Sequence, residues 1–116
     1  MKRCYSLKRN KEFRRVYRIG KTQKCRTLVL IYTKSCGPAN RFGFSVSKKL
    51  GNSVIRNRIK RRLREAVRLQ FDDIKTSYNF IFIARGAVLT ESFSALMSQV
   101  RLVLDRAGLI KDVAEK

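Results

Sequence analysis

Apolar residues recur at helical spacing in three stretches of the chain. Residues 10–19 place Phe13, Val16 and Tyr17 three and four positions apart, which predicts a short helix with one apolar side. After a turn at Leu50-Gly51-Asn52, a second apolar stripe comprises Ile55, Ile59, Leu63, Ala66 and Val67. A third stripe follows Thr90 and Glu91, which are expected to open a helix, and comprises Phe93, Leu96, Met97, Val100, Val103 and Leu104. The spacing therefore predicts three amphipathic helices.

Three other stretches have the pattern of strands. Residues 27–33 and 78–84 are apolar at consecutive positions, so each predicts a strand with both faces covered. Residues 41–47 alternate between large apolar side chains and small or basic ones, which predicts a strand with one buried face. Residues 20–26, between the first helix and the first of these strands, are interpreted as a basic linker.

These elements predict one domain over residues 1–116, with loose ends at 1–9 and 109–116. Helices over a small sheet indicate a two-layer α/β sandwich. The second helix joins two strands that are parallel if they are neighbours. Because such crossovers are almost always right-handed, a right-handed connection is the default expectation.

Basic residues are concentrated in one half of the chain. The net charge is +20, and residues 1–64 hold 21 Lys or Arg with a single acid, whereas residues 65–116 hold seven of each. Since 44% of the residues are hydrophobic, this charge belongs to a folded scaffold and not to a disordered tail. Such a surface suits a polyanion, and a nucleic acid backbone is the first candidate.

A membrane is the less favoured partner for this charge. No apolar run approaches the roughly 20 residues that cross a bilayer, and the N-terminus leads into more charge instead of a signal-peptide core. No amphipathic segment is left over for lipid binding once the core is built. We expect a soluble, cytoplasmic protein.

The cysteine and histidine content limits the chemistry. Cys4, Cys25 and Cys36 are odd in number and lack CxxC spacing, and the chain has no His, so neither a disulfide framework nor a zinc site is expected. Free thiols are the expected state. The absence of His also removes the usual general base of Ser-His, Cys-His and ribonuclease chemistry. We therefore expect no catalytic residue and no metal ligand in this chain.

The second helix carries almost only basic residues between its apolar positions. Like charges four residues apart, such as Arg58 and Arg62, repel each other and lower helix stability. An exposed structural face would contain more Glu, so nucleic acid contact is favoured over a merely solvated face. Lys48 and Lys49 precede the helix, where free backbone N–H groups make a plausible phosphate site.

Aromatic residues and a flat strand face form a second candidate surface. Phe13 and Tyr17, flanked by cations, either dock the first helix on the core or stack on unpaired bases. On the strand at 41–47, Gly43 and Ser45 leave room for a ligand, although small polar residues are also common on ordinary solvent faces. The residue types alone leave these alternatives open.

The segment from Arg41 to Arg64 closely resembles the signature of the protein subunit of bacterial ribonuclease P. The matching residues are Phe44-Ser45-Val46-Ser47-Lys48-Lys49, Gly51-Asn52 and Arg56-Asn57-Arg58-Ile59-Lys60-Arg61. The similarity extends through Glu12-Phe13, Val16-Tyr17, Tyr32-Thr33 and Phe82-Ile83-Ala84-Arg85, and it covers most of the chain in the right order.

The resemblance implies both a fold and a function. The implied fold is an α+β two-layer sandwich of three helices and a small mixed sheet of about four strands, in the order α-β-β-β-α-β-α, with a left-handed βαβ crossover in place of the default. The implied function is that of an RNA-binding cofactor of an endoribonuclease, in which a catalytic RNA subunit removes the 5′ leader of precursor tRNA. Mg²⁺ would be held mainly by the RNA, and neither an organic cofactor nor an obligate protein partner is expected.

The resemblance also assigns residues to two RNA partners. The residues implied to bind the catalytic RNA are Arg56, Asn57, Arg58, Lys60, Arg61, Arg62, Arg64 and Arg68. Those implied to border the single-stranded leader are Phe13, Tyr17, Tyr32, Ser45, Ser47, Lys48 and Lys49.

Two alternative functions are weighed beside this one. A ribosomal or chaperone-like RNA-binding protein would use the same charge, but its RNA binding would be indifferent to a 5′ leader. A stand-alone nuclease is disfavoured, because the basic half lacks both His and the acidic cluster that two catalytic metals require.

Overall fold

The computed structural model of the chain describes residues 10–35 and 37–111. Within these residues the helices and strands are α1 (Asn10–Ile19), β1 (Lys21–Lys24), β2 (Leu28–Lys34), β3 (Arg41–Ser45), α2 (Ser53–Arg68), β4 (Tyr78–Ala84) and α3 (Phe93–Arg106). Three short 3-10 helices connect them, namely η2 (Lys48–Leu50), η3 (Phe71–Asp73) and η4 (Gly86–Thr90). The α-β-β-β-α-β-α order and the α+β class are confirmed.

The four strands form one mixed sheet in the order β1-β2-β4-β3. β2 pairs antiparallel with both β1 and β4, whereas β3 runs parallel to β4. The two strands predicted to be covered on both faces, β2 and β4, are the two inner strands. In this sheet, a strand with apolar residues on both faces therefore lies at a central position.

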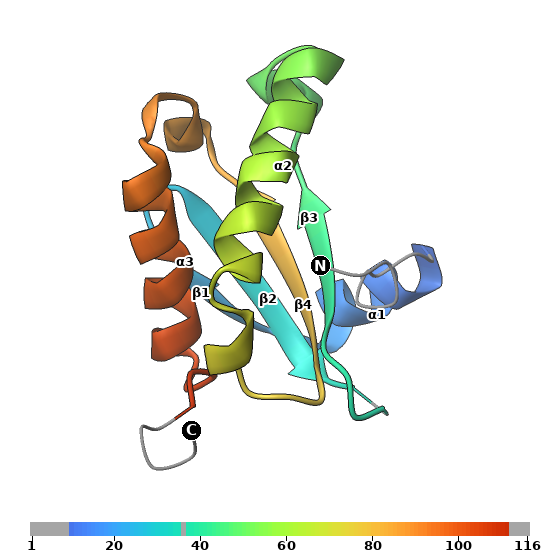
Figure 1. Cartoon of the computed structure of the whole chain (residues 1–116). Coiled ribbons are helices and arrows are strands. Elements are labelled where there is room, and N and C mark those ends of the chain that lie inside the picture. The colour runs from blue at the N-terminus through green and yellow to red at the C-terminus, as the bar shows by residue number, and fades with distance from the viewer. Residues whose placement is uncertain (1–9, 36, 112–116) are drawn as a thin grey trace.

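The connection from β3 through α2 to β4 is left-handed. With α2 in front of the sheet and both strands pointing upward, the chain passes from β3 to β4 on its left (Figure 1). The default right-handed expectation is therefore wrong for this unit, and the crossover implied by the family resemblance is confirmed.

Helices cover both faces of the sheet (Figure 1). α2 and α3 lie on one face, over a core that includes the fully buried Phe42, Phe80 and Phe82. The Phe42 and Phe80 rings stack with their centroids 5.0 Å apart across the parallel strands. α1 lies on the other face, where Val16 packs with Ile31 and Ile81 in a second, smaller core.

The turn before α2 fixes where the basic helix begins. Asn52 is the N-cap, and its side-chain oxygen accepts a hydrogen bond from the Ile55 backbone N–H at 3.0 Å. Gly51 has φ +155°, and a Cβ at this position would lie 2.8 Å from Ile55 Cγ2. Only glycine fits both conditions without strain, so this turn depends on it.

Two predicted boundaries are wrong. Residues 20–26 are not only a linker, because Lys21–Lys24 form β1 at the sheet edge; this strand is polar and mostly exposed, so it lacks an apolar pattern. The last helix does not open at Thr90 and Glu91. Those residues end η4 and begin the link to α3, and Ser92 caps α3 by accepting a hydrogen bond from the Ala95 backbone N–H.

The predicted loose ends fall partly outside the described residues, which exclude 1–9 and 112–116. Residues 109–111 are described and are held in place. Leu109 is only 2% exposed, its carbonyl oxygen accepts a hydrogen bond from Lys75 N–H at 2.8 Å, and Ile110 forms a bridge with Ile74. The prediction of a loose segment is therefore wrong for these three residues.

Two further findings concern the described part of the chain. None of its helices is long and apolar enough to span a bilayer. Cys25 is a half-buried free thiol, as expected. Cys4 and Cys36 lie outside the described residues.

Candidate RNA interface

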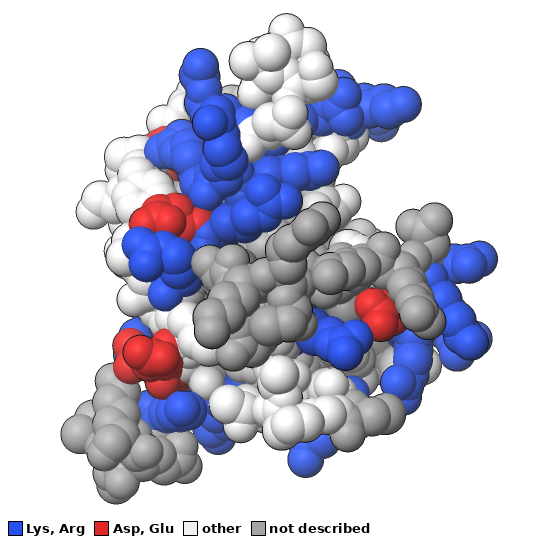
Figure 2. All heavy atoms as spheres, turned by 45° about the vertical axis from the view of Figure 1, so that its right-hand side comes forward, with Lys and Arg blue, Asp and Glu red and all other residues white. Residues whose placement is uncertain are grey.

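α2 presents a row of cations opposite its buried stripe. Ile59, Leu63, Ala66 and Val67 face the core and leave the basic positions on the outside. Of the residues predicted to bind RNA, Asn57, Arg58, Arg61, Arg64 and Arg68 are exposed, whereas Arg56, Lys60 and Arg62 are half-buried. We call these eight residues the α2 surface. Figure 2 shows basic side chains gathered over this part of the molecule.

The cations of the α2 surface differ in what they already bind. Arg68 pairs with the Glu65 carboxylate through two hydrogen bonds, and the same contact holds the pKa of Glu65 below its ordinary value. Arg62 donates to the Glu91 backbone carbonyl at 3.1 Å, which ties α2 to the segment before α3. Arg58 and Arg61 take part in no ion pair among the described residues. They are the cations most available to a phosphate backbone.

Three features add detail to this surface. Asn57, Arg61 and Arg64, with Val54, line a shallow recess of about 450 Å³. The Arg64 guanidinium lies 5.9 Å from the centre of the Phe44 ring, so β3 helps to fix its position. The half-buried Arg56 has its Nε atom without a hydrogen-bond partner in the described residues.

α1 carries the predicted aromatic residues on the other face of the sheet. Phe13 packs against the small core around Val16, so it serves the docking role that its spacing left open. Tyr17 is 45% exposed and remains accessible to a ligand. An ion pair of 2.9 Å between Arg41 and Glu12 joins β3 to α1.

The predicted polar residues lie along β3 and the turn after it. In β3, Phe42 and Phe44 pack on the α2 side, so strand alternation places Arg41, Gly43 and Ser45 on the α1 side. Ser47 caps η2 by accepting a hydrogen bond from the Lys49 backbone N–H at 3.2 Å. Lys48 and Lys49 are both exposed in η2. We call Phe13, Tyr17, Ser45, Ser47, Lys48 and Lys49 the α1–β3 surface.

Tyr32 does not belong to the α1–β3 surface. It packs against the large core on the α2 and α3 side of the sheet, whereas its neighbour Ile31 faces α1. A shift of one residue reverses the face of a strand side chain, and an apolar strand gives no pattern that would reveal it. The predicted placement of Tyr32 beside Phe13 and Tyr17 is therefore corrected.

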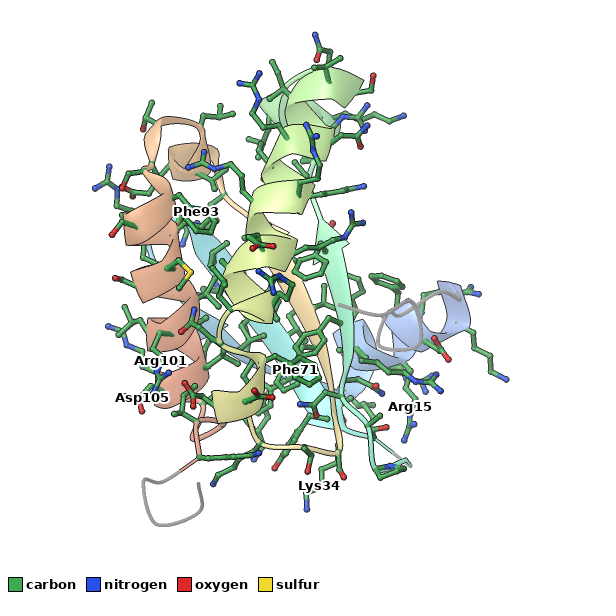
Figure 3. The ribbon with its side chains drawn as sticks, viewed as in Figure 1. Arg15, Lys34, Phe71, Phe93, Arg101 and Asp105 are labelled. Atoms are coloured by element: carbon green, nitrogen blue, oxygen red, sulfur yellow. The ribbon has the colours of Figure 1, made fainter. Side chains whose placement is uncertain are left out.

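Sequence reasoning missed a small hollow beside the α1–β3 surface. Arg15 extends from α1 toward the loop between β2 and β3, and with Arg41 and Asn79 it lines a hollow of about 250 Å³ (Figure 3). The Asn79 side-chain oxygen is buried there without a hydrogen-bond partner among the described residues. The only sequence signal for this position was Asn79 itself, a polar residue near the start of the otherwise apolar strand β4.

The described residues contain no group of three or more Cys, Asp or Glu side chains placed to hold a metal ion. The side chains that gather at the surface are instead phosphate-binding and base-stacking types. The fold and the two surfaces thus define a small α+β protein that binds RNA.

The comparisons with known proteins agree with this class and narrow it. The model of the Ribonuclease P family matches residues 1–108. The ribonuclease P protein component of Caldanaerobacter subterraneus subsp. tengcongensis is 40% identical over 106 residues, covering 91% of each chain. That of Clostridium botulinum strain Langeland is 44% identical over 104 residues, covering 89% of this chain and 94% of its own.

Solved structures give the same result. The RNase P protein of Staphylococcus aureus is 32% identical and superposes with a TM-score of 0.85, covering 92% of this chain and 98% of its own. The RNase P protein of Thermotoga maritima shares the fold with a TM-score of 0.81, at 23% identity and with 87% and 96% covered. This chain belongs to the family of ribonuclease P protein components. It is the protein part of an endoribonuclease whose catalysis is carried out by its RNA subunit.

Proposed function

We propose that this chain binds two RNAs, the catalytic RNA through the α2 surface and the 5′ leader of precursor tRNA through the α1–β3 surface. Family membership supports the holoenzyme role and favours it over the ribosomal or chaperone-like alternative. The division between the two surfaces rests on their geometry. α2 and α1 lie on opposite faces of the sheet, so two RNA segments can be engaged at the same time.

The observation that carries the proposal is the concentration of exposed, unpaired cations on α2. Arg58 and Arg61 repel their basic neighbours on the helix, and no described carboxylate pairs with them. An RNA backbone would remove this repulsion, because its phosphates neutralise the cations and release counterions. We therefore assign the α2 surface to the large RNA partner.

The α1–β3 surface has the properties of a single-strand site. Tyr17 offers an accessible ring for base stacking, and Lys48 and Lys49 offer charge for the adjacent phosphates. Gly43 and Ser45 have small side chains, so this face of β3 leaves room for a ligand to lie against the sheet. An unpaired leader fits this surface better than a duplex, whose bases are not available for stacking.

The chemistry of hydrolysis belongs to the RNA in this proposal. Mg²⁺ would be held mainly by RNA phosphate oxygens, and the protein would lower the repulsion between the two RNAs, which reduces the Mg²⁺ needed for assembly. No step requires a protein acid or base. The holoenzyme would act in the cytoplasm, where precursor tRNA is made.

Binding experiments with the assembled holoenzyme test the leader assignment. Precursor tRNA and mature tRNA are compared at one fixed salt concentration, with and without the protein. We expect the protein to tighten binding of the precursor and to change that of mature tRNA little, because only the precursor carries the leader. Equal tightening of both would contradict a leader site and favour a general electrostatic effect.

A further inference from the structure

Basic residues also gather around the turn between β1 and β2, outside the two surfaces assigned above. Lys24 ends β1, Arg26 lies in the turn, and Arg85 follows the end of β4. All three residues are exposed, and we call them the β1–β2 turn surface. β1 is the edge strand opposite β3 and lies beside α3 (Figure 1). The surface is therefore at the far edge of the sheet from β3.

Two hydrogen bonds fix Arg85 at this turn. Its backbone N–H donates to the Thr27 carbonyl at 2.8 Å, and its guanidinium donates to the Cys25 carbonyl at 3.1 Å. The guanidinium is thus anchored through one of its five N–H groups and keeps others for a ligand. Arg85 is held beside Arg26, although the two residues are distant in the sequence.

Lys24 and Arg85 extend from the same face of the sheet. Lys24 pairs with Val29, which packs on the α1 side. Arg85 has an extended backbone and is two residues beyond Ile83, which packs on the α1 side as well. Because alternate side chains of an extended chain share a face, the Lys24 and Arg85 side chains form one cationic surface.

The charge of the β1–β2 turn surface is unpaired. Lys24, Arg26 and Arg85 take part in no ion pair among the described residues. Charged residues on an edge strand can prevent pairing with another sheet. That role does not account for Arg26 and Arg85, which lie outside β1. The cluster therefore favours an anionic partner.

An extended peptide fits this edge poorly. Cys25 N–H donates to the Leu28 carbonyl across the hairpin, so the backbone groups of Lys24 point away from β2. The Lys24 carbonyl already accepts a hydrogen bond from the Arg106 guanidinium at 3.1 Å. Arg106 thus occupies a position at which an added strand would pair. The anionic partner is more simply a phosphate backbone.

The residues around the turn favour base-paired RNA over a single strand. Residues 20–27 and 84–90 contain no aromatic side chain. Single-strand sites stack the bases on aromatic rings, whereas base-paired RNA is bound through its phosphates and 2′-hydroxyl groups. Lys and Arg side chains can make these backbone contacts without reading a base.

We propose that the β1–β2 turn surface binds the backbone of a helical segment of the catalytic RNA. Mature tRNA also contains helices, but the proposed function, on which this inference rests, leaves binding of mature tRNA nearly unchanged. The surface gives the protein a second attachment to the catalytic RNA besides the α2 surface. Two separated contacts fix the orientation of the protein on the RNA, which a single row of cations would leave free to rotate.

The test is lysine footprinting, in which a reagent acetylates accessible lysines and mass spectrometry measures the extent at each position. The full chain is treated alone, with the catalytic RNA, and with the catalytic RNA and precursor tRNA together. We expect the catalytic RNA alone to reduce acetylation of Lys24 several-fold. Lys75 and Lys111 belong to none of the three surfaces and should react equally with and without RNA.

Two simpler probes test whether the surface prefers base-paired RNA. A blunt RNA duplex of about 16 base pairs, the span of a compact double-strand-binding domain, is compared with an oligouridylate of equal phosphate content. We expect the duplex to protect Lys24 more strongly than the oligouridylate does. Equal or stronger protection by the single strand would contradict the preference for a helical segment.

A pair of charge-matched variants measures the contribution to binding. Lys24→Gln with Arg26→Gln should lower the salt dependence of catalytic RNA binding by about 1.8 in slope, at about 0.9 per lost duplex phosphate contact. Lys75→Gln with Lys111→Gln removes the same charge and should leave the slope unchanged. Arg85 is kept in both variants because its guanidinium holds the turn.

Three results would overturn the proposal. They are full acetylation of Lys24 with the catalytic RNA, protection that appears only after precursor tRNA is added, and equal salt slopes for the two double variants. Lys60 of the α2 surface is measured in the same spectra. Protection of Lys60 without Lys24 contradicts only the β1–β2 turn surface, whereas full acetylation of Lys60 contradicts the proposed function.

Discussion

Arginines of the same helix have different surroundings, and their roles follow from these. Arg62 and Arg68 bind protein groups, whereas Arg58 and Arg61 extend into solvent without an ion-pair partner among the described residues. An arginine that already has a partner has fewer free N–H donors for a phosphate. We therefore expect the contributions to RNA binding to be uneven along α2.

Arg58→Ala tests the α2 surface at a single residue. We expect weaker binding of the catalytic RNA and a salt dependence that is flatter by about one unit of slope, because one phosphate contact is lost. The measurement is a titration of the RNA subunit at several salt concentrations. Arg106→Ala is the control, since Arg106 is an exposed arginine in the last turn of α3. Equal slopes for the wild-type protein and Arg58→Ala would place the catalytic RNA elsewhere.

Tyr17→Ala tests the α1–β3 surface at its most accessible ring. Loss of stacking should weaken precursor binding by about 1–3 kcal/mol and leave binding of mature tRNA unchanged. Tyr17→Phe keeps the ring and should bind the precursor nearly as tightly as the wild-type protein. Holoenzyme binding assays with both tRNAs measure these differences. A similar loss for precursor and mature tRNA would instead indicate a structural role for this residue.

At the residue scale, sequence reasoning succeeded where charge and chemistry determine the answer. The exposed cations of α2 could be predicted because a helix that buries Ile59 and Leu63 must turn its arginines outward. The partners of Arg62 and Arg68 could not all be predicted, because the Glu91 carbonyl that binds Arg62 is distant in the sequence. The face of Tyr32 was also hidden, since the four strand positions before it, 28–31, are all apolar.

At the scale of elements, the start of α2 controls how the basic surface is presented. The Asn52 side chain satisfies one of the free N–H groups of the first turn. Asn52→Ala should therefore lower the free energy of unfolding by about 1 kcal/mol. Urea denaturation measures this as a lower midpoint. Ser53→Ala, at an exposed neighbour outside the cap, should leave the midpoint unchanged, and equal midpoints for the two variants would contradict the capping role.

The strands and the crossover show which features of the fold the local apolar pattern predicts and which it does not. β2 and β4 were predicted because both faces of an inner strand must be apolar. β1 was missed because an edge strand gains its hydrogen bonds from β2 and needs no apolar side chains of its own. Crossover handedness depends on how α2 packs over the whole sheet, and the general rule for such units gave the wrong hand.

For the whole molecule, the uneven distribution of charge along the sequence corresponds to a division of roles among the elements. The basic half of the sequence supplies α1, β3 and α2, which carry the two proposed RNA surfaces, while the balanced half supplies β4 and α3 for the core. Some of the few acidic residues form ion pairs between elements, as in the 2.8 Å ion pair between Arg101 and Asp73 that joins α3 to η3. Most cations of α1, β3 and α2 therefore take part in no ion pair among the described residues.

The central claim is that this protein supports cleavage by RNA and does not cleave on its own. The most direct measurement is 5′ cleavage of a precursor tRNA at low Mg²⁺ by a bacterial ribonuclease P RNA, with the protein, without it, and with the protein alone. We predict efficient cleavage only when RNA and protein are both present, because the protein offsets the repulsion that Mg²⁺ would otherwise have to screen. Cleavage by the protein alone, or no stimulation of the RNA, would contradict this account.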